Sequence, residues 1–176
     1  MFRLKQKHSR PDKRKYPEPD VKLMLAEESL LRGVLGSLAV AGLLCWIWAV
    51  QAMTTGRVFP WFSILIGILI GIAMRRFGRG LDWRFPLSAG LVAGVAAYAG
   101  NLMIGVLETG QYIEAQPMEV IAGLSLDTMK NFFKNTINPV DHIYAFCGIG
   151  LAAFLAKRRL NRREVLVLRT IEKAKN

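Results

Sequence analysis

Residues 59–84, FPWFSILIGILIGIAMRRFGRGLDWR, decide the fold class of this chain. An apolar run, 59–74, is followed at once by a segment with four arginines, and a second apolar run, 85–107, comes directly after it. Two further apolar runs lie at 33–53 and 140–156. A helix needs roughly 17–25 mostly apolar residues to cross a membrane, and the runs lack the alternation typical of a membrane strand. The sequence therefore predicts an all-α membrane protein with four transmembrane helices.

The basic residues predict how these helices are oriented. Of the 24 Lys and Arg residues, 21 lie before residue 33, between residues 75 and 84, or after residue 156. Only Arg57, Lys130 and Lys134 lie in the two remaining segments. Because Lys and Arg collect in cytoplasmic loops, both termini are expected in the cytoplasm, and the membrane would be the inner membrane if the protein is bacterial.

Three other segments accompany the membrane domain, which is expected over residues 20–156. Residues 1–19 are basic and rich in proline, which is typical of a flexible cytoplasmic arm. Residues 118–137 show an imperfect helical period and are expected to form an amphipathic helix on the outer face. It could act as a lid or partner-docking surface over the bundle, or merely anchor a connector. Residues 157–176 predict a basic amphipathic tail on the cytoplasmic side.

Small residues recur at intervals of four in the last three runs, which places them on one face of each helix. Small side chains let helix backbones approach closely in a membrane. We therefore expect packing within the chain, centred on the run 85–107, with a seam between two copies as the alternative. The expected packing residues are Gly67, Gly71, Ala89, Gly90, Ala93, Gly94, Ala97, Gly105, Gly148, Ala152 and Ala156.

A few polar residues fall within or beside the runs. Asn101 lies on the small-residue face of 85–107, where its amide is expected to bind a neighbouring helix or to line a cavity. Asn138, Asp141 and His142 open the last run. With Asn138 as the N-cap, Asp141 falls where a carboxylate is favoured by the helix dipole, so a helix cap is preferred over a metal or proton-transfer site.

The basic residues beside the runs are expected to contact anionic lipid headgroups or a partner protein. These candidates are Arg75, Arg76, Arg79, Arg84, Lys157, Arg158, Arg159, Arg162 and Arg163. Trp83 suits the membrane interface, and Gly78 and Gly80 permit a tight reversal of the chain. The net charge of +11 is explained by orientation and anionic lipid, so nucleic acid is not predicted as a partner.

Cys45 and Cys147 both lie inside predicted helices, where we expect them to be packing residues. This placement predicts neither a disulfide framework nor a cysteine metal site. The sequence shows no pattern for a catalytic residue, a metal ion or another cofactor.

A family resemblance is carried by residues 60–157. Its motifs are Gly67-x-x-x-Gly71, Arg75-Arg76-x-Gly78-x-Gly80 and Asp141-x-x-Tyr144-Ala145. The chain resembles a group of bacterial four-span membrane proteins of unknown function, some of which carry an N-terminal zinc ribbon. The first 32 residues here contain no cysteine, so the resemblance implies a shared architecture without the metal site, and no activity.

Three functions are compatible with these features. The leading hypothesis is a non-catalytic structural or accessory subunit of a membrane protein complex, which contacts anionic lipid and either partner helices or a second copy. An oligomeric small-solute transporter or channel is the alternative, although the runs contain no charged residue in their middle. A lipid-modifying enzyme is the second alternative, but Asp141 and His142 are predicted on the opposite membrane face from the arginine segment.

Overall fold

The computed structural model describes residues 26–162 and 164–166, which belong to two compact units. The larger unit is Glu28–Arg158. Its helices are α2 (Leu30–Thr55), α3 (Phe62–Gly78), α4 (Arg84–Tyr112), α5 (Pro117–Ala122), α6 (Leu126–Thr136) and α7 (Pro139–Ala156). The described residues contain no β-strand, so the all-helical prediction is confirmed. The predicted arm, 1–19, and most of the predicted tail lie outside the described residues.

Three of the helices are long and apolar enough to cross a membrane. They are α2, α4 and α7, with 26, 29 and 18 residues, and they contain three of the four predicted runs. The remaining run corresponds to α3, which has 17 residues and is not among the three. It begins only at Phe62 because the chain makes a turn first, in which the Phe62 N–H donates to the Phe59 carbonyl at 3.1 Å.

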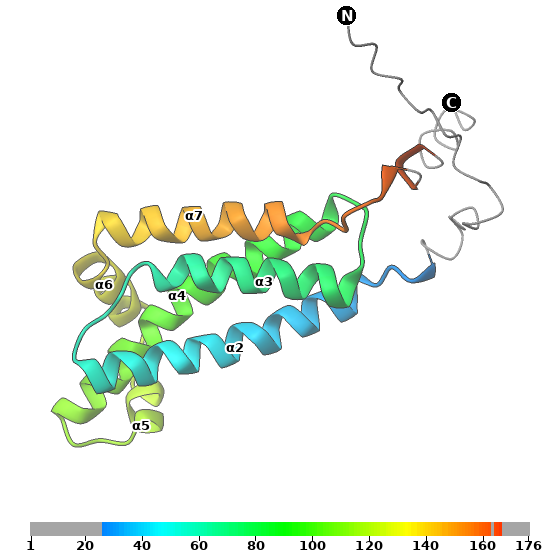
Figure 1. The fold of residues 1–176 in the computed structure, drawn as a ribbon. Helices are drawn as coiled ribbons and strands as arrows, with labels where there is room; N and C mark the ends of the chain where they lie inside the picture. The colour runs from blue at the N-terminus through cyan, green and yellow to red at the C-terminus, as the bar shows by residue number, and fades with distance from the viewer. Residues whose placement is uncertain (1–25, 163, 167–176) are drawn as a thin grey trace, which may run out of the picture. The chain divides into compact units, whose positions relative to one another are not determined.

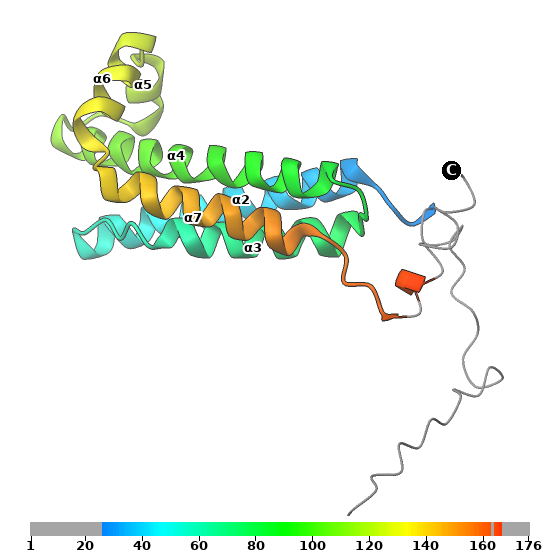
Figure 2. The ribbon, with the colours of Figure 1, turned by 90° about the horizontal axis from the view of Figure 1, so that it is seen from above.

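The helices α2, α3, α4 and α7 form a four-helix bundle (Figure 1). Going round the bundle, the order of packed neighbours is α2, α3, α7, α4, and α3 also packs against α4 across the middle. Successive bundle helices reverse direction, so α3 and α7 run parallel to each other (Figures 1 and 2). The run 85–107 was expected at the centre of the bundle. Its helix α4 does contact the other three helices, but α3 shares this position.

The closest packing in the bundle joins α3 to α7. A Cβ atom added to Gly67 would collide with the backbone of Gly148, and one added to Gly71 would lie 2.7 Å from the Ala152 carbonyl oxygen. Both helices carry their small residues four positions apart and run in the same direction, so two successive turns of each helix come into backbone contact.

A large aromatic side chain fills the seam between α2 and α4. Trp48 is fully buried and stacks on Phe62, with ring centroids 5.6 Å apart. Its six-membered ring lies over Gly100, where a Cβ atom would come within 2.7 Å of it. The indole N–H of Trp48 has no hydrogen-bond partner among the described residues. Trp48 therefore contributes to this seam through the packing of its rings and not through a hydrogen bond.

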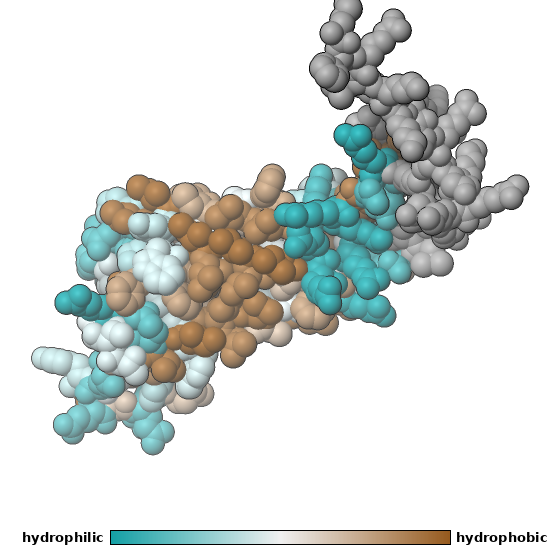
Figure 3. Space-filling view, viewed as in Figure 1, coloured by the Kyte–Doolittle hydropathy of each residue, from teal (hydrophilic) through white to brown (hydrophobic). Residues whose placement is uncertain are grey.

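The two ends of the bundle differ. We call the end that carries the α3–α4 loop, Arg79–Trp83, the arginine end, and the end that carries α5 and α6 the cap end (Figure 1). On the face shown in Figure 3, hydrophobic side chains gather over the middle of the bundle and more hydrophilic ones lie toward the cap end.

The segment 118–137 forms two short helices instead of the single one that was expected. α5 ends at Ala122, and α6 begins at Leu126 after a break at Gly123–Ser125. Ser125 caps α6, since its hydroxyl oxygen accepts a hydrogen bond from the Thr128 N–H at 3.1 Å. An N-cap serine starts a new helix because it satisfies an otherwise free amide, and this local signal outweighs the helical period of the whole segment.

Candidate functional site

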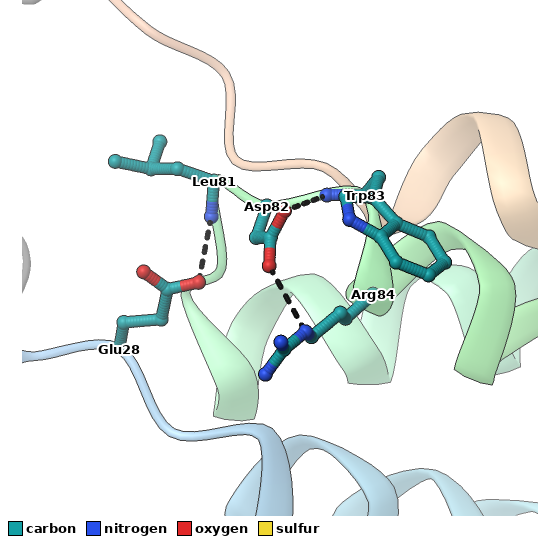
Figure 4. Close-up of polar contacts among 5 residues, drawn as sticks. All are labelled: Glu28, Leu81, Asp82, Trp83 and Arg84. Atoms are coloured by element: carbon teal, nitrogen blue, oxygen red, sulfur yellow. Dashed lines mark hydrogen bonds and ion pairs between the residues drawn. The ribbon is translucent and has the colours of Figure 1, made fainter.

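Three backbone segments are tied together at the arginine end. The Ser29 N–H, just before α2, donates to the Gly78 carbonyl at 3.0 Å, and the Arg158 N–H, just after α7, donates to the Gly80 carbonyl at 3.1 Å. The Leu81 N–H donates to a carboxylate oxygen of Glu28 at 3.4 Å (Figure 4). These bonds join the beginning of α2 and the end of α7 to the α3–α4 loop, so the loop has a defined place on the bundle.

The reversal between α3 and α4 differs in detail from the prediction. The residue in the left-handed backbone conformation is Arg79, with φ of 48°, and not Gly78 or Gly80. Arg79 is the C-cap residue of α3. Gly78 and Gly80 serve close packing, because a Cβ atom on Gly78 would come within 2.7 Å of the Phe85 ring and one on Gly80 would collide with it. The buried Phe85 ring thus fixes the loop against the first turn of α4.

An acidic residue organises the start of α4. The Asp82 carboxylate accepts a hydrogen bond from the Trp83 N–H at 2.7 Å, and its second oxygen lies 3.4 Å from Nε of Arg84 (Figure 4). The Arg84 side chain is 68% exposed and that of Asp82 is 43% exposed, so the pair orients Arg84 more than it stabilises the fold.

Six basic residues lie in the chain segments that meet at this end. We use the name arginine collar for Arg75, Arg76, Arg79, Arg84, Lys157 and Arg158. Four of these six residues are exposed, and Arg75 and Arg158 are half-buried. The exposed aromatic side chains of Phe77 and Trp83 lie in the same stretch of chain. Guanidinium groups bind phosphate oxygens in a bidentate manner, so the collar suits phosphate-bearing partners.

The other basic candidates lie outside the larger unit. Arg159 and Arg162 are exposed and belong to the smaller compact unit. In that unit, the Asn161 N–H donates to the Glu164 carboxylate at 2.7 Å. Arg163 lies outside the described residues.

The small residues predicted for packing serve three different seams. Gly67, Gly71, Gly148 and Ala152 form the α3–α7 contact, and Gly90 and Gly94 of α4 face Ile149 of α7. The alanines at 89, 93, 97 and 156 are buried. Gly105 faces a helix outside the bundle, because a Cβ atom there would collide with the Phe132 ring of α6.

Within the described part of the chain, the amide nitrogen of Asn101 has no hydrogen-bond partner on a neighbouring helix. The side chain is half-buried, and its N–H donates to the Ala97 carbonyl of the same helix at 3.0 Å. This bond engages one of the two N–H groups of the amide, and the contact is local to α4.

The residues that open α7 form a cap and a link to α4. The Asp141 carboxylate accepts a hydrogen bond from the Asn138 N–H at 2.8 Å, which is the arrangement of a capping box. Nδ1 of His142 lies 2.8 Å from the Tyr98 hydroxyl oxygen of α4. The Tyr98 ring also meets the edge of Phe133 of α6, with centroids 6.1 Å apart. Tyr98 therefore connects three helices, and nothing in the sequence pattern marks it.

The described residues show no group of three or more His, Cys, Asp and Glu side chains that could hold a metal ion. Cys45 is buried, with its sulfur 3.3 Å from the Ala96 carbonyl oxygen, and Cys147 is exposed on α7. Asp141 and His142 stand in the first turn of α7, and the collar residue Lys157 directly follows its end, so about 23 Å along the helix separates them from Lys157.

Comparison with known proteins adds no residue to this site. The resemblance to bacterial four-span proteins stays a prediction, because no protein-family model, curated protein or solved structure matches the chain.

Proposed function

We propose that the protein is a four-span membrane protein with both termini in the cytoplasm, and that it serves as a non-catalytic accessory subunit of a membrane protein complex. The arginine collar contacts anionic lipid at the cytoplasmic surface. Partner helices pack on its exposed apolar faces within the membrane.

The bundle supports α3 as the fourth span. With 17 residues it is about 26 Å long, close to the length of the 18-residue α7 beside it. It carries no charged residue between Phe62 and Met74, and it packs against all three other bundle helices. A helix enclosed in this way shares the environment of its neighbours. If α2, α4 and α7 cross a membrane, α3 crosses with them.

The arginine collar is the observation that carries the proposal. It gathers six cationic side chains from α3, the following loop, the start of α4 and the segment after α7 at one end of the bundle. The backbone bonds to Gly78 and Gly80 hold the segments together. Clustered basic residues beside a membrane helix bind anionic headgroups, and the exposed Trp83 suits the same interface.

The apolar surface supports contact with partner helices. Leu43 and Trp46 on α2, Leu91 on α4 and Phe154 on α7 are each more than half exposed. A Cβ atom added to Gly42 of α2 or Gly150 of α7 would meet nothing within 4 Å. Exposed glycines beside large apolar side chains leave hollows that a neighbouring membrane helix can enter.

A transporter or a lipid-modifying enzyme has less support. The only buried polar or charged residues in the described part of the chain are Ser37 and Ser63, and the Ser37 hydroxyl donates to the Ile70 carbonyl at 3.5 Å. Solute pathways through membranes are usually marked by ionisable groups that face the bundle interior.

Lipid binding by the collar can be tested with two matched triple variants. Arg75, Arg76 and Arg79 are replaced by Gln in one, and Arg57, Lys130 and Lys134, which lie outside the collar, are replaced by Gln in the other. Each variant loses three positive charges, and binding to phosphatidylglycerol in phosphatidylcholine vesicles is measured by native mass spectrometry. The collar variant should bind phosphatidylglycerol about ten-fold or more weakly than the control variant does. An equal loss in both would contradict a specific role of the collar.

The accessory role has a separate test. The full chain is extracted in mild detergent and its native mass is determined together with any co-purifying protein. A stable assembly with a second membrane protein supports the proposal, and a lone species of 19.7 kDa would contradict it.

A further inference from the structure

A cavity of about 330 Å³ lies at the cap end, between the last turns of α4 and the two helices α5 and α6. We call it the cap pocket. Its walls are Leu102, Gly105, Val106, Thr109, Ile113, Ala115, Glu119, Val120, Gly123, Leu124, Thr128 and Phe132. Figures 1 and 2 show α5 and α6 beside this end of α4, outside the four-helix bundle.

One face of α4 forms the inner wall of the cap pocket. Leu102, Val106, Thr109 and Ile113 follow one another at intervals of three or four residues, so they lie on the same side of the helix. Gly105 lies on this face without a side chain, and the Phe132 ring of α6 packs against it. The missing side chain lets α6 approach α4 at this point, while the space beside it stays open.

The chemistry of the walls is apolar except at one place. The Thr109 hydroxyl already donates to the Gly105 carbonyl at 2.7 Å, and the Thr128 hydroxyl is 2.8 Å from that of Ser125. Neither hydroxyl therefore requires a ligand. Glu119 is the only charged residue in the walls, and its side chain is exposed. An anionic headgroup would be repelled there, whereas an ammonium group would be attracted.

The size and depth of the cap pocket fit an alkyl chain. Pockets for small molecules usually have volumes of about 300–1,000 Å³, so this one has no room for a helix or a folded partner. Its α4 wall runs from Leu102 to Ile113, over about 17 Å, and passes the end of the apolar run 85–107. The pocket thus starts at the depth of the proposed hydrocarbon core and ends beside polar residues. A lipid likewise passes from apolar surroundings at its acyl chain to polar surroundings at its headgroup.

We propose that the cap pocket holds one acyl chain of a phospholipid whose headgroup carries an ammonium, with the Glu119 carboxylate beside that ammonium. The inference rests on the proposed placement of the protein in a membrane. It assigns the cap end a zwitterionic lipid, which differs in net charge from the anionic lipid proposed at the arginine collar.

The test uses full-length protein in vesicles that contain phosphatidylethanolamine with a diazirine in one acyl chain. After irradiation, the labelled residues are identified by peptide mass spectrometry. Labelling is expected at Val106, Leu124 and Phe132 inside the pocket, in addition to the exposed Leu91 on the outside of α4. Native protein without label in the pocket, but with label at Leu91, would overturn the inference and leave the membrane placement intact. Absence of label at Leu91 as well would contradict both.

A variant in which a larger side chain fills the cap pocket can be compared with a variant that carries the same exchange outside it. Val120→Trp places a larger side chain in the wall, and Val95→Trp makes the same exchange at a position of α4 that is 67% exposed. In Val120→Trp, labelling of the pocket residues should fall at least about five-fold, while labelling of Leu91 should not change. Val95→Trp should keep the pocket labelling. Ala115→Phe is a second filling variant, for use if Val120→Trp does not retain native helix content. Unchanged pocket labelling in a folded filling variant would overturn the proposal.

The headgroup is tested by competition with unlabelled lipid. Phosphatidylethanolamine should displace the label about two- to five-fold better than phosphatidylglycerol, since an exposed charge pair contributes modestly. Glu119→Gln should remove that preference, and Glu108→Gln, on the same helix as the α4 wall but outside the pocket walls, should retain it. Equal competition by the two lipids in the native protein would contradict the assignment of Glu119.

Discussion

The backbones of Gly67 on α3 and Gly148 on α7 lie in direct contact. A Cβ atom on Gly148 would come within 2.5 Å of the Ser63 carbonyl oxygen, and a Cβ atom on Gly67 would collide with Gly148 itself. Neither position therefore has space for a side chain. In a membrane, where apolar side chains gain little from leaving the lipid, such close contact is a main source of helix association.

Replacing one of these glycines should destabilise the bundle. Gly67→Ala forces a methyl group into the Gly148 backbone, so we expect a loss of about 1–3 kcal/mol in the free energy of unfolding. Gly42→Ala is the matched control, since a Cβ atom there meets nothing within 4 Å and alanine favours the helix by up to about 1 kcal/mol. Unfolding in mixed detergent micelles measures both. Equal stability of the two variants would contradict the close α3–α7 contact.

Removing one oxygen atom should weaken the contact between Tyr98 of α4 and His142 of α7. Tyr98→Phe removes the hydroxyl that lies 2.8 Å from Nδ1 of His142 but keeps the ring that packs on Phe133. The expected cost is about 0.5–1.5 kcal/mol, the usual contribution of one hydrogen bond. Tyr112→Phe is the control, because Tyr112 is 90% exposed. A Tyr98→Phe variant as stable as this control in thermal unfolding would argue against the bond.

At Trp48, substitution by Phe should change the free energy of unfolding little, whereas substitution by Ala should lower it strongly. Because its indole N–H has no partner among the described residues, Trp48→Phe removes an unsatisfied donor along with some apolar area. The two effects oppose each other, and the net change should stay within about 1 kcal/mol. Trp48→Ala leaves a cavity and should cost about 3–5 kcal/mol. If both variants lost the same stability in chemical unfolding, the seam would depend on the N–H rather than on the ring.

The cap of α7 predicts a moderate effect at Asp141. Asp141→Ala removes the acceptor for the Asn138 N–H and the charge near the start of the helix, which should cost about 0.5–2 kcal/mol. Asp141→Asn keeps an oxygen acceptor and should retain part of that stability. Thermal unfolding of the two variants gives the comparison, and a more stable Asp141→Ala variant would contradict the capping role.

The sequence identifies local features well and long-range contacts poorly. The apolar runs predicted all four bundle helices to within a few residues at most of their ends, because hydropathy is a property of each segment by itself. The largest differences are at the C-terminal ends of α3 and α4, which extend through Gly78 and Tyr112 beyond the predicted runs. The cap at Asn138 and Asp141 was also visible, since its parts are three residues apart.

The contacts that the sequence did not reveal join distant segments. Tyr98 meets His142 across 44 positions, and the Phe132 ring lies on Gly105 although the small-residue stripe suggested a neighbouring membrane helix there. Which partner covers a small residue depends on the whole arrangement of the helices. The left-handed conformation of Arg79 was missed because two glycines flank it, and glycine is the usual residue for such a turn.

The most direct test of the account asks whether α3 crosses the membrane. Cys45 and Cys147 are first replaced by Ser, and a single cysteine is then introduced by Arg57→Cys, Arg84→Cys, Asn131→Cys or Asn161→Cys, all at exposed positions. Sealed vesicles with the cell exterior facing outward are treated with a maleimide that cannot cross membranes. Arg57→Cys and Asn131→Cys should react in intact vesicles, and Arg84→Cys and Asn161→Cys only after permeabilisation. Reaction of Arg57→Cys and Arg84→Cys from the same side would contradict the four-span topology.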